Sequence, residues 1–214
     1  ADLEVVADRL GLDDLVVVGL SGGGPYALGA SRVLGDRVRA VGVLGGVAPT
    51  VGADAVGGGA VGLARRFSPL VRPLRLPLGV GLTGAVRLLR PAASTAIGAY
   101  ARLSPEADRE LLNRPEFKAM FLDDLLNGSR KQLSAPLADL VLFGRHWGFE
   151  LAEVGAPVRW WHGDADNIVP FEHGRHVVEH LPDAELYELA GRSHLGGLGV
   201  GPDVLEVLVD VADR

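Results

Sequence analysis

The stretch Leu15-Val16-Val17-Val18-Gly19-Leu20-Ser21-Gly22-Gly23-Gly24-Pro25 decides how the chain is interpreted. Residues 15–18 are apolar at every position and rich in β-branched side chains, which is typical of a strand buried on both faces of a parallel sheet. Pro25 suits the first turn of the helix that the residues after it predict. A serine therefore stands on a sharp turn between a buried strand and a helix.

This turn has the pattern Gly-x-Ser-x-Gly, from Gly19 to Gly23. A serine in that place needs strained backbone angles, and we expect both glycines to remove side chains that would collide with the strand and the helix. The backbone N–H of Gly22 would lie at the helix N-terminus and stabilise an oxyanion. Leu20 is expected to bind the substrate beside Gly22. A phosphate-binding loop is disfavoured, because neither of the usual glycine spacings for nucleotides is present.

The rest of the chain predicts a parallel α/β sheet interrupted by a helical cap. Further strands are expected at residues 38–44, 158–162 and 185–189, with helices between them, so the sheet is built from βαβ units. We expect residues 1–50 and 151–214 to form this core and residues 51–150 to form the cap. Within the cap, proline and glycine break the pattern into helices at residues 55–67, 79–89, 91–103, 105–113, 115–127 and 136–143.

Composition excludes several classes of function. The 214 residues include no cysteine, which rules out disulfides, thiolate metal sites and a cysteine nucleophile. A net charge of −6 argues against a nucleic-acid partner. The charge is uneven, because residues 55–105 hold seven arginines and no acidic residue, which leaves 14 basic and 27 acidic residues elsewhere. We expect these arginines to form a solvated face rather than a site that attracts anionic substrates or a membrane surface. The sequence shows neither a membrane span nor a signal peptide, and we expect a cytoplasmic protein.

Two loops carry groups that could activate the serine. His162-Gly163-Asp164-Ala165-Asp166-Asn167-Ile168-Val169-Pro170 follows the third strand, and Gly191-Arg192-Ser193-His194 follows the fourth. Loops at the carboxyl ends of parallel strands meet at one edge of the sheet. A serine nucleophile needs a base that is oriented by a third group. Ser21, an aspartate and His194 therefore form a candidate triad, with Asp164 and Asp166 both available as the acid.

These three motifs resemble those of the α/β-hydrolase superfamily, of the kind with a helical cap. The resemblance implies that Ser21 is the nucleophile, His194 the base and Asp166, rather than Asp164, the acid. It implies a hydrolase that cleaves an ester or related acyl bond through an acyl-enzyme. No cofactor is expected, and the substrate is expected to be a small molecule with an apolar acyl part. Acyl transfer, C–C cleavage and peroxidation use the same triad and stay open, as does a noncatalytic ligand-binding protein or inactive fragment.

The chain departs from that family at its beginning. The family has four strands before the nucleophile strand and takes its second oxyanion donor from a loop after an earlier strand. Residues 1–10 predict only a helix. We therefore expect the C-terminal portion of a longer hydrolase, with about four strands, an exposed edge on its first strand and weak or absent turnover.

The remaining histidines have simpler explanations than metal binding. His162 is expected to pack at the end of its strand. His173, His176 and His180 recur at helical spacing and would share one helix face. A solvated helix face is favoured over a metal site there, and we expect no metal.

Overall fold

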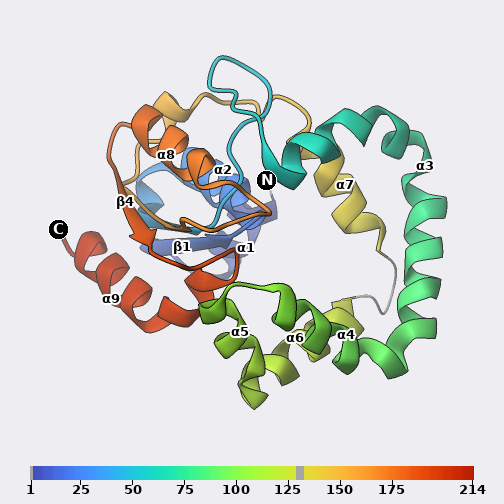
Figure 1. Ribbon diagram of the computed structural model, residues 1–214. Coiled ribbons are helices and arrows are strands. Elements are labelled where there is room, and N and C mark those ends of the chain that lie inside the picture. Colours follow the sequence, from blue (N-terminus) through green and yellow to red (C-terminus); the bar gives the residue numbers. More distant parts are fainter. Residues whose placement is uncertain (1, 129–132) are drawn as a thin grey trace.

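The computed structural model describes residues 2–128 and 133–214. At its centre is a sheet of four parallel strands, in the spatial order β1-β2-β3-β4. The strands are β1 (Leu15–Leu20), β2 (Val38–Leu44), β3 (Val158–Gly163) and β4 (Ala184–Leu189) (Figure 1). This confirms the prediction of a parallel α/β sheet with about four strands. Because the strands run the same way, the loops that follow them meet at one edge.

Helices cover both faces of this sheet. One face packs against α2 (Gly23–Leu34) and α8 (Phe171–His180), and the other against α9 (Gly201–Ala212) (Figure 1). Helix α1 (Asp2–Leu10) contacts α2. Short 3-10 helices lie at Gly35–Arg37, Arg90–Ala92, Leu151–Glu153 and Gly196–Val200.

The core is apolar on both sides of the sheet. On the α2 and α8 side, Trp160 of β3 is fully buried in one cluster with Leu28 and Val177. On the α9 side, Leu208 is fully buried in a second cluster with Trp161. Burial of each such side chain contributes roughly 1.5–3 kcal/mol, so the carboxyl ends of the strands are held on a rigid base.

A helical insertion, residues 59–143, connects β2 to β3. It leaves the sheet at the carboxyl end of β2 and forms a wide arc beside the sheet (Figure 1). Its helices are α3 (Gly59–Leu89), α4 (Ala93–Leu103), α5 (Glu106–Asn113), α6 (Pro115–Gly128) and α7 (Ser134–Phe143).

Helix α3 corrects the sequence-based prediction. Residues 55–67 and 79–89 were expected to be separate helices, but one helix runs from Gly59 to Leu89 with Pro69, Pro73 and Pro77 inside it. The prediction of a break was wrong because the prolines are four residues apart. Their missing N–H groups therefore lie along one side of the helix, and the hydrogen bonds on the other sides can continue.

Strand β1 is exposed on one face and one edge. Within the described residues it pairs only with β2. Val16, Val18 and Leu20 alternate along it and remain 38%, 44% and 38% exposed, on the face that α9 covers farther along the sheet. The exposed edge expected from the sequence is therefore present, but the expectation of a strand buried on both faces was wrong, because α9 packs against β2 and β3 and leaves this face of β1 open.

Candidate active site

The turn after β1 holds Ser21 in an unusual backbone conformation. Its φ is 53°, and among the described residues no other non-glycine residue has a positive φ. The backbone N–H of Ser21 donates to the carbonyl of Leu44 at 2.8 Å, and the carbonyl of Ser21 accepts from the N–H of Gly24 at 3.0 Å. Such strain costs on the order of 1–3 kcal/mol and persists only where the surroundings enforce it. These bonds anchor the turn between β2 and the start of α2.

Of Gly19 and Gly23, only Gly19 stands where a side chain would not fit. A side chain at Gly19 would collide with the backbone carbonyl of Gly23, so the strand can approach the helix only without one. A Cβ atom on Gly23 would meet nothing within 4 Å. The expectation that Gly23 also prevents a collision was wrong, because at that position the backbone faces open space.

Three side chains from three different loops meet at this turn. The Oγ of Ser21 lies 2.8 Å from Nε2 of His194, and Nδ1 of His194 lies 2.7 Å from Oδ2 of Asp166. An ionised Asp166 accepts a hydrogen bond from the N–H at Nδ1, which leaves Nε2 without a proton and able to accept a hydrogen bond from the Ser21 hydroxyl. The structure thus brings together the serine, histidine and aspartate that the sequence placed after β1, β4 and β3.

The carboxylate of Asp166 is almost fully buried and held on both oxygens. Its Oδ1 accepts from the N–H groups of Ile168 and Val169 at 2.8 and 2.9 Å. Burial by itself would raise the pKa of Asp166, but hydrogen bonds from His162 and His194, the charge of His194 and the amide of Val169 outweigh it. The net effect holds the pKa of Asp166 below its usual value. The group therefore stays charged next to His194.

Asp164 serves a different loop contact. Its Oδ1 accepts from the backbone N–H of Gly191 at 2.7 Å, so it joins the loop after β3 to the loop after β4. Gly163 allows the same approach, because a side chain there would collide with the carbonyl of Arg192. This close packing places His194 within hydrogen-bond distance of Asp166. The side chain of Asp164 instead bonds the backbone of Gly191.

His162 is fully buried beside the same aspartate. The indole N–H of Trp160 donates to Nδ1 of His162 at 3.1 Å, so the ring carries its proton on Nε2. That Nε2–H donates to the carbonyl of Val169 at 2.8 Å and lies 3.5 Å from Oδ2 of Asp166. His162 packs at the strand end as expected, and it also braces the loop that carries Asp166. The Trp-x-His spacing on one strand face was the available signal for this contact.

Gly22 is placed to donate to an anionic oxygen. It is the N-cap residue of α2, and among the described residues no hydrogen-bond partner is recorded for its N–H. The ring of Phe143, at the end of α7, would lie 3.1 Å from a Cβ atom on Gly22. Phe143 therefore forms an apolar wall beside this N–H, and no local sequence signal indicated it. The side chain of Leu20 lies on the exposed face of β1, and its expected role stays a prediction.

No protein-family model and no curated protein matches the chain. Solved structures match it closely in shape. An α/β-hydrolase fold protein from Nakamurella multipartita is 23% identical, with a TM-score of 0.61 over 98% of this chain and 72% of that one. The chain has the fold of part of an α/β-hydrolase. Two further structures match similarly. An esterase from a Rhodococcus species is 20% identical, with a TM-score of 0.61 over 99% of this chain and 70% of that one. A bromoperoxidase from Bacillus anthracis is 18% identical, with a TM-score of 0.61 over 100% of this chain and 72% of that one.

In this α/β-hydrolase fold, the helical insertion contacts the loop that carries His194. Asp108 of α5 is buried, and its Oδ1 accepts from the backbone N–H of Ser193 at 3.2 Å. Leu195 packs into one apolar cluster with Leu111 and Leu112 of α5. Asp108 comes from a segment 85 residues away, and no local pattern singled it out.

Two tyrosines of the α/β-hydrolase fold also lie near charged groups of this region. Burial raises the pKa of the Tyr100 phenol on α4, and the charges of Asp108 and Asp166 raise it further. Burial and the hydrogen bond from its hydroxyl to Asp139, at 2.6 Å, raise the pKa of Tyr26 to about 12. The second contact ties α2 to α7 beside the serine turn.

The expectation that the histidines of α8 form a solvated face was wrong for His173, which is fully buried, and only His180 is exposed. Nδ1 of His173 accepts from the N–H of Ala48 at 3.2 Å, Nε2 of His176 donates to the carbonyl of Asp54 at 2.9 Å, and Nδ1 of His180 bonds the carbonyl of His176 at 2.7 Å. Within the described residues, no group of three His, Cys, Asp or Glu side chains is arranged to hold a metal ion. No helix in the described part of the chain is long and apolar enough to cross a membrane.

Proposed function

We propose that this chain carries the active site of a serine hydrolase that cleaves an ester or related acyl bond through an acyl-enzyme. The observation that carries the proposal is the connected series of two short hydrogen bonds from Ser21 through His194 to Asp166. A strained serine, a histidine in the correct tautomer and a buried, charged aspartate are the elements that make a hydroxyl nucleophilic at neutral pH.

The proposed reaction has two halves. Ser21 Oγ attacks the acyl carbon while its proton passes to Nε2 of His194, and Asp166 stabilises the resulting imidazolium. The negative charge that develops on the acyl oxygen is stabilised by the N–H of Gly22 at the N-terminus of α2. His194 then returns the proton to the leaving oxygen, and the acyl group stays on Ser21. Water repeats the sequence, with its proton taken by His194, and releases the acid.

The substrate is proposed to be a small molecule with an apolar acyl part. Phe143 stands directly beside Gly22 and would contact a group bound to Ser21. The backbone of Phe143 is held in place, because Thr50 donates from its hydroxyl to the carbonyl of Phe143 at 2.6 Å. We assign the helical insertion the role of the cap expected from the sequence, with residues 51–150 as its extent. A cytoplasmic location is part of the same proposal.

The test is covalent labelling with a fluorophosphonate, in which the activated hydroxyl displaces fluoride and forms a phosphonate ester. The expected result is a single adduct on the peptide that contains Ser21, located by mass spectrometry. Labelling reports an activated serine and needs no complete turnover. Ser21→Ala should abolish the adduct, and Ser94→Ala, which removes an exposed hydroxyl on α4, should leave it unchanged.

A folded protein that resists the probe would contradict the proposal and favour the alternative of a noncatalytic ligand-binding protein. The type of reaction is then separated by incubation with p-nitrophenyl acetate. An acetyl group trapped on Ser21 supports acyl chemistry. Labelling by the probe without a detectable acyl-enzyme would instead favour C–C cleavage or peroxidation catalysed by the same three side chains.

A further inference from the structure

Helix α3 presents its apolar side to the solvent. Gly79 and Thr83 are its buried positions in the segment from residue 71 onward, and both face α7: the Thr83 hydroxyl accepts from the N–H of Leu133 at 2.9 Å. On the opposite side, Leu74, Leu78 and Leu88 remain 51%, 41% and 81% exposed. The apolar side of a helix normally faces the protein interior, but the apolar side of α3 faces the solvent.

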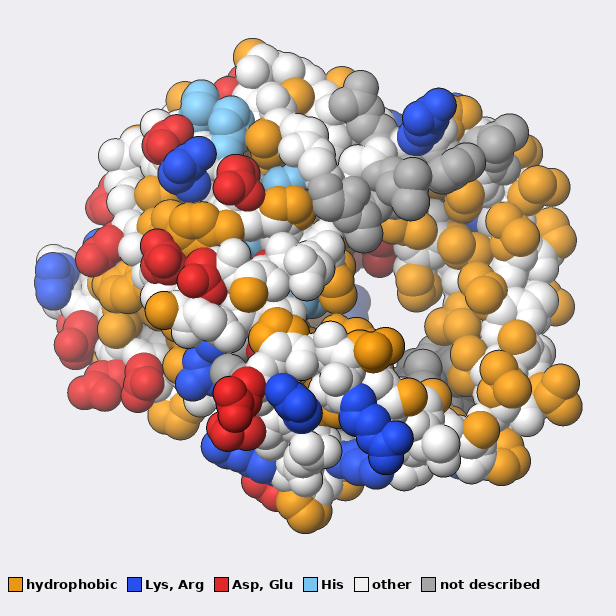
Figure 2. All heavy atoms as spheres, in the orientation of Figure 1, with side chains coloured by type: hydrophobic (Ala, Val, Ile, Leu, Met, Phe, Trp, Pro, Cys, Tyr) orange, Lys and Arg blue, Asp and Glu red, His pale blue; other side chains and the backbone are white. Residues whose placement is uncertain are grey.

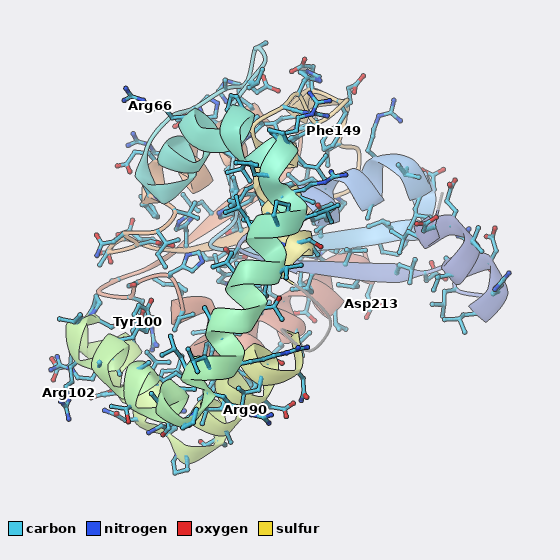
Figure 3. The ribbon with its side chains drawn as sticks, turned by 90° about the vertical axis from the view of Figure 1, so that its right-hand side faces the viewer. Arg66, Arg90, Tyr100, Arg102, Phe149 and Asp213 are labelled. Carbon is cyan, nitrogen blue, oxygen red and sulfur yellow. The ribbon has the colours of Figure 1, made fainter. Side chains whose placement is uncertain are left out.

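The charged residues of this segment all lie on the other half of the helix. A turn of ~100° per residue places Arg72, Arg75, Arg87 and Arg90 on the half that faces α7. The solvent-facing half is made of leucine, valine, alanine, glycine and proline. Figure 2 shows hydrophobic side chains along α3 at the right-hand edge of the molecule, and Figure 3 shows α3 in front, with Arg90 at its lower end.

Three arginines gather behind this apolar side. Arg72 and Arg75 of α3 and Arg145, just after α7, line a pocket of about 560 Å³ whose lining contains no acidic residue. Within the described residues, none of these three arginines forms an ion pair. A pocket with several unneutralised guanidinium groups favours phosphate or another anion.

We propose that α3 is a membrane-surface helix, with its apolar side against an anionic bilayer and Arg72, Arg75 and Arg145 behind it, within the range over which their charge attracts the lipid phosphates. An amphipathic helix of this composition, with arginines opposite leucines, is suited to lie in the plane of the interface. This departs from the expectation that the cap arginines form a solvated face. The reason is the exposed apolar side of α3, which the charge of the sequence does not reveal.

The charge distribution selects an anionic partner. Residues 55–105 carry seven arginines and no acidic residue, whereas the remaining 14 basic and 27 acidic residues give the rest of the chain a charge of −13. An anionic surface therefore attracts the α3 side and repels the remainder, which orients the molecule. A second copy of this chain would bring two regions of net positive charge toward each other, so self-association through this face is disfavoured.

The experiment measures binding of the chain to lipid vesicles by co-sedimentation, independently of any hydrolase activity. We expect binding to vesicles of phosphatidylcholine mixed with phosphatidylglycerol, weak binding to phosphatidylcholine alone, and release at high salt. Arg72→Glu and Arg75→Glu should each lower the partition coefficient at least about fivefold, since one basic residue near such a surface contributes that much. Leu74→Asp with Leu78→Asp should abolish binding.

Matched changes on other helices control for charge and exposure. Arg175→Glu on α8 repeats the charge reversal, and Leu205→Asp with Val209→Asp repeats the apolar loss on α9, where these side chains are 59% and 53% exposed. These variants should bind like the unaltered chain, with circular dichroism as the check on folding. Equal binding to both kinds of vesicle, equal losses in the control variants, or a dimer that hides α3 and binds no vesicle would each overturn the proposal.

Discussion

Oδ1 of Asp108 lies 3.2 Å from the backbone nitrogen of Ser193, so a helix of the insertion holds the residue immediately before His194. The other oxygen of Asp108 is buried and has no hydrogen-bond partner within the described residues. Leu195 and Leu198 continue the contact in an apolar cluster with α4, α5 and α6. The position of the proposed base therefore depends on helices that are distant in the chain.

Asp108→Ala should slow fluorophosphonate labelling of Ser21 by up to about 10²-fold, because small displacements of a reacting group can cost that much. Asp108→Asn keeps an oxygen acceptor for the N–H of Ser193 and should label nearly as fast as the unaltered chain. The second-order rate of labelling is the measurement. Equal slowing by both variants would show that the charge of Asp108, and not its hydrogen bond, is what matters.

Trp160→Phe should slow labelling about tenfold, since the lost indole N–H leaves a buried acceptor on His162 unsatisfied at a cost of ~1–3 kcal/mol. The ring of His162 can then adopt its other tautomer and release Val169 from its brace. Trp161→Phe is the matched control, because Trp161 stacks on Tyr187 at 4.9 Å on the other side of the sheet. Comparable effects of the two changes would point to lost packing alone.

In the longer hydrolase expected from the sequence, Ser21→Ala should lower ester hydrolysis by on the order of 10⁶-fold, and His194→Ala by a similar factor, because the two side chains act as a unit. The double variant should be no slower than either single one. Hydrolysis of p-nitrophenyl esters is followed by absorbance. Substantial activity retained in Ser21→Ala would mean that another group performs the reaction.

The stability of the fold should decrease in mild acid because of His173. Burial, followed by the nearby His162 and His176, lowers the pKa of His173 below its ordinary value of 6.5. Just below pH ~6.5, His173 is therefore protonated more in the unfolded chain than in the folded one. This contribution to stability is fully present above pH ~6.5 and is lost as the pH falls below that value. His173→Asn should flatten the acid limb of urea unfolding, whereas His180→Asn, an exposed change on the same helix, should not.

The open face of β1 should promote self-association at high concentration. Val18 is 44% exposed in the middle of an apolar strand whose edge is unpaired within the described residues. Val18→Lys should raise the concentration at which light scattering detects aggregates, since charge on an edge strand opposes pairing. Val33→Lys, which alters an apolar side chain of α2 that is 54% exposed, is the control. If both changes help equally, added charge is the cause and the strand is not.

Local signals predicted the strands and the three meeting side chains. The run before Ser21 and the loops beginning at His162 and Gly191 each follow a strand, and parallel strands bring such loops together. The contacts of Asp108 and Phe143 had no such signal, because their partners are about a hundred residues away in the chain and are reached only through packing. The continuity of α3 was missed for another reason. A single proline predicts the end of a helix, but the effect of several prolines depends on where they fall around the helix axis.

The three prolines of α3 also set a limit on depth. Pro69, Pro73 and Pro77 lack the N–H groups that would bond the carbonyls of residues 65, 69 and 73 within the helix. A bare carbonyl is costly in hydrocarbon but inexpensive among water and lipid headgroups. Three such oxygens along one side of α3 need water or headgroup atoms as hydrogen-bond donors. The helix is therefore suited to a bilayer surface, and the cost of burying these oxygens opposes its insertion into the hydrocarbon core.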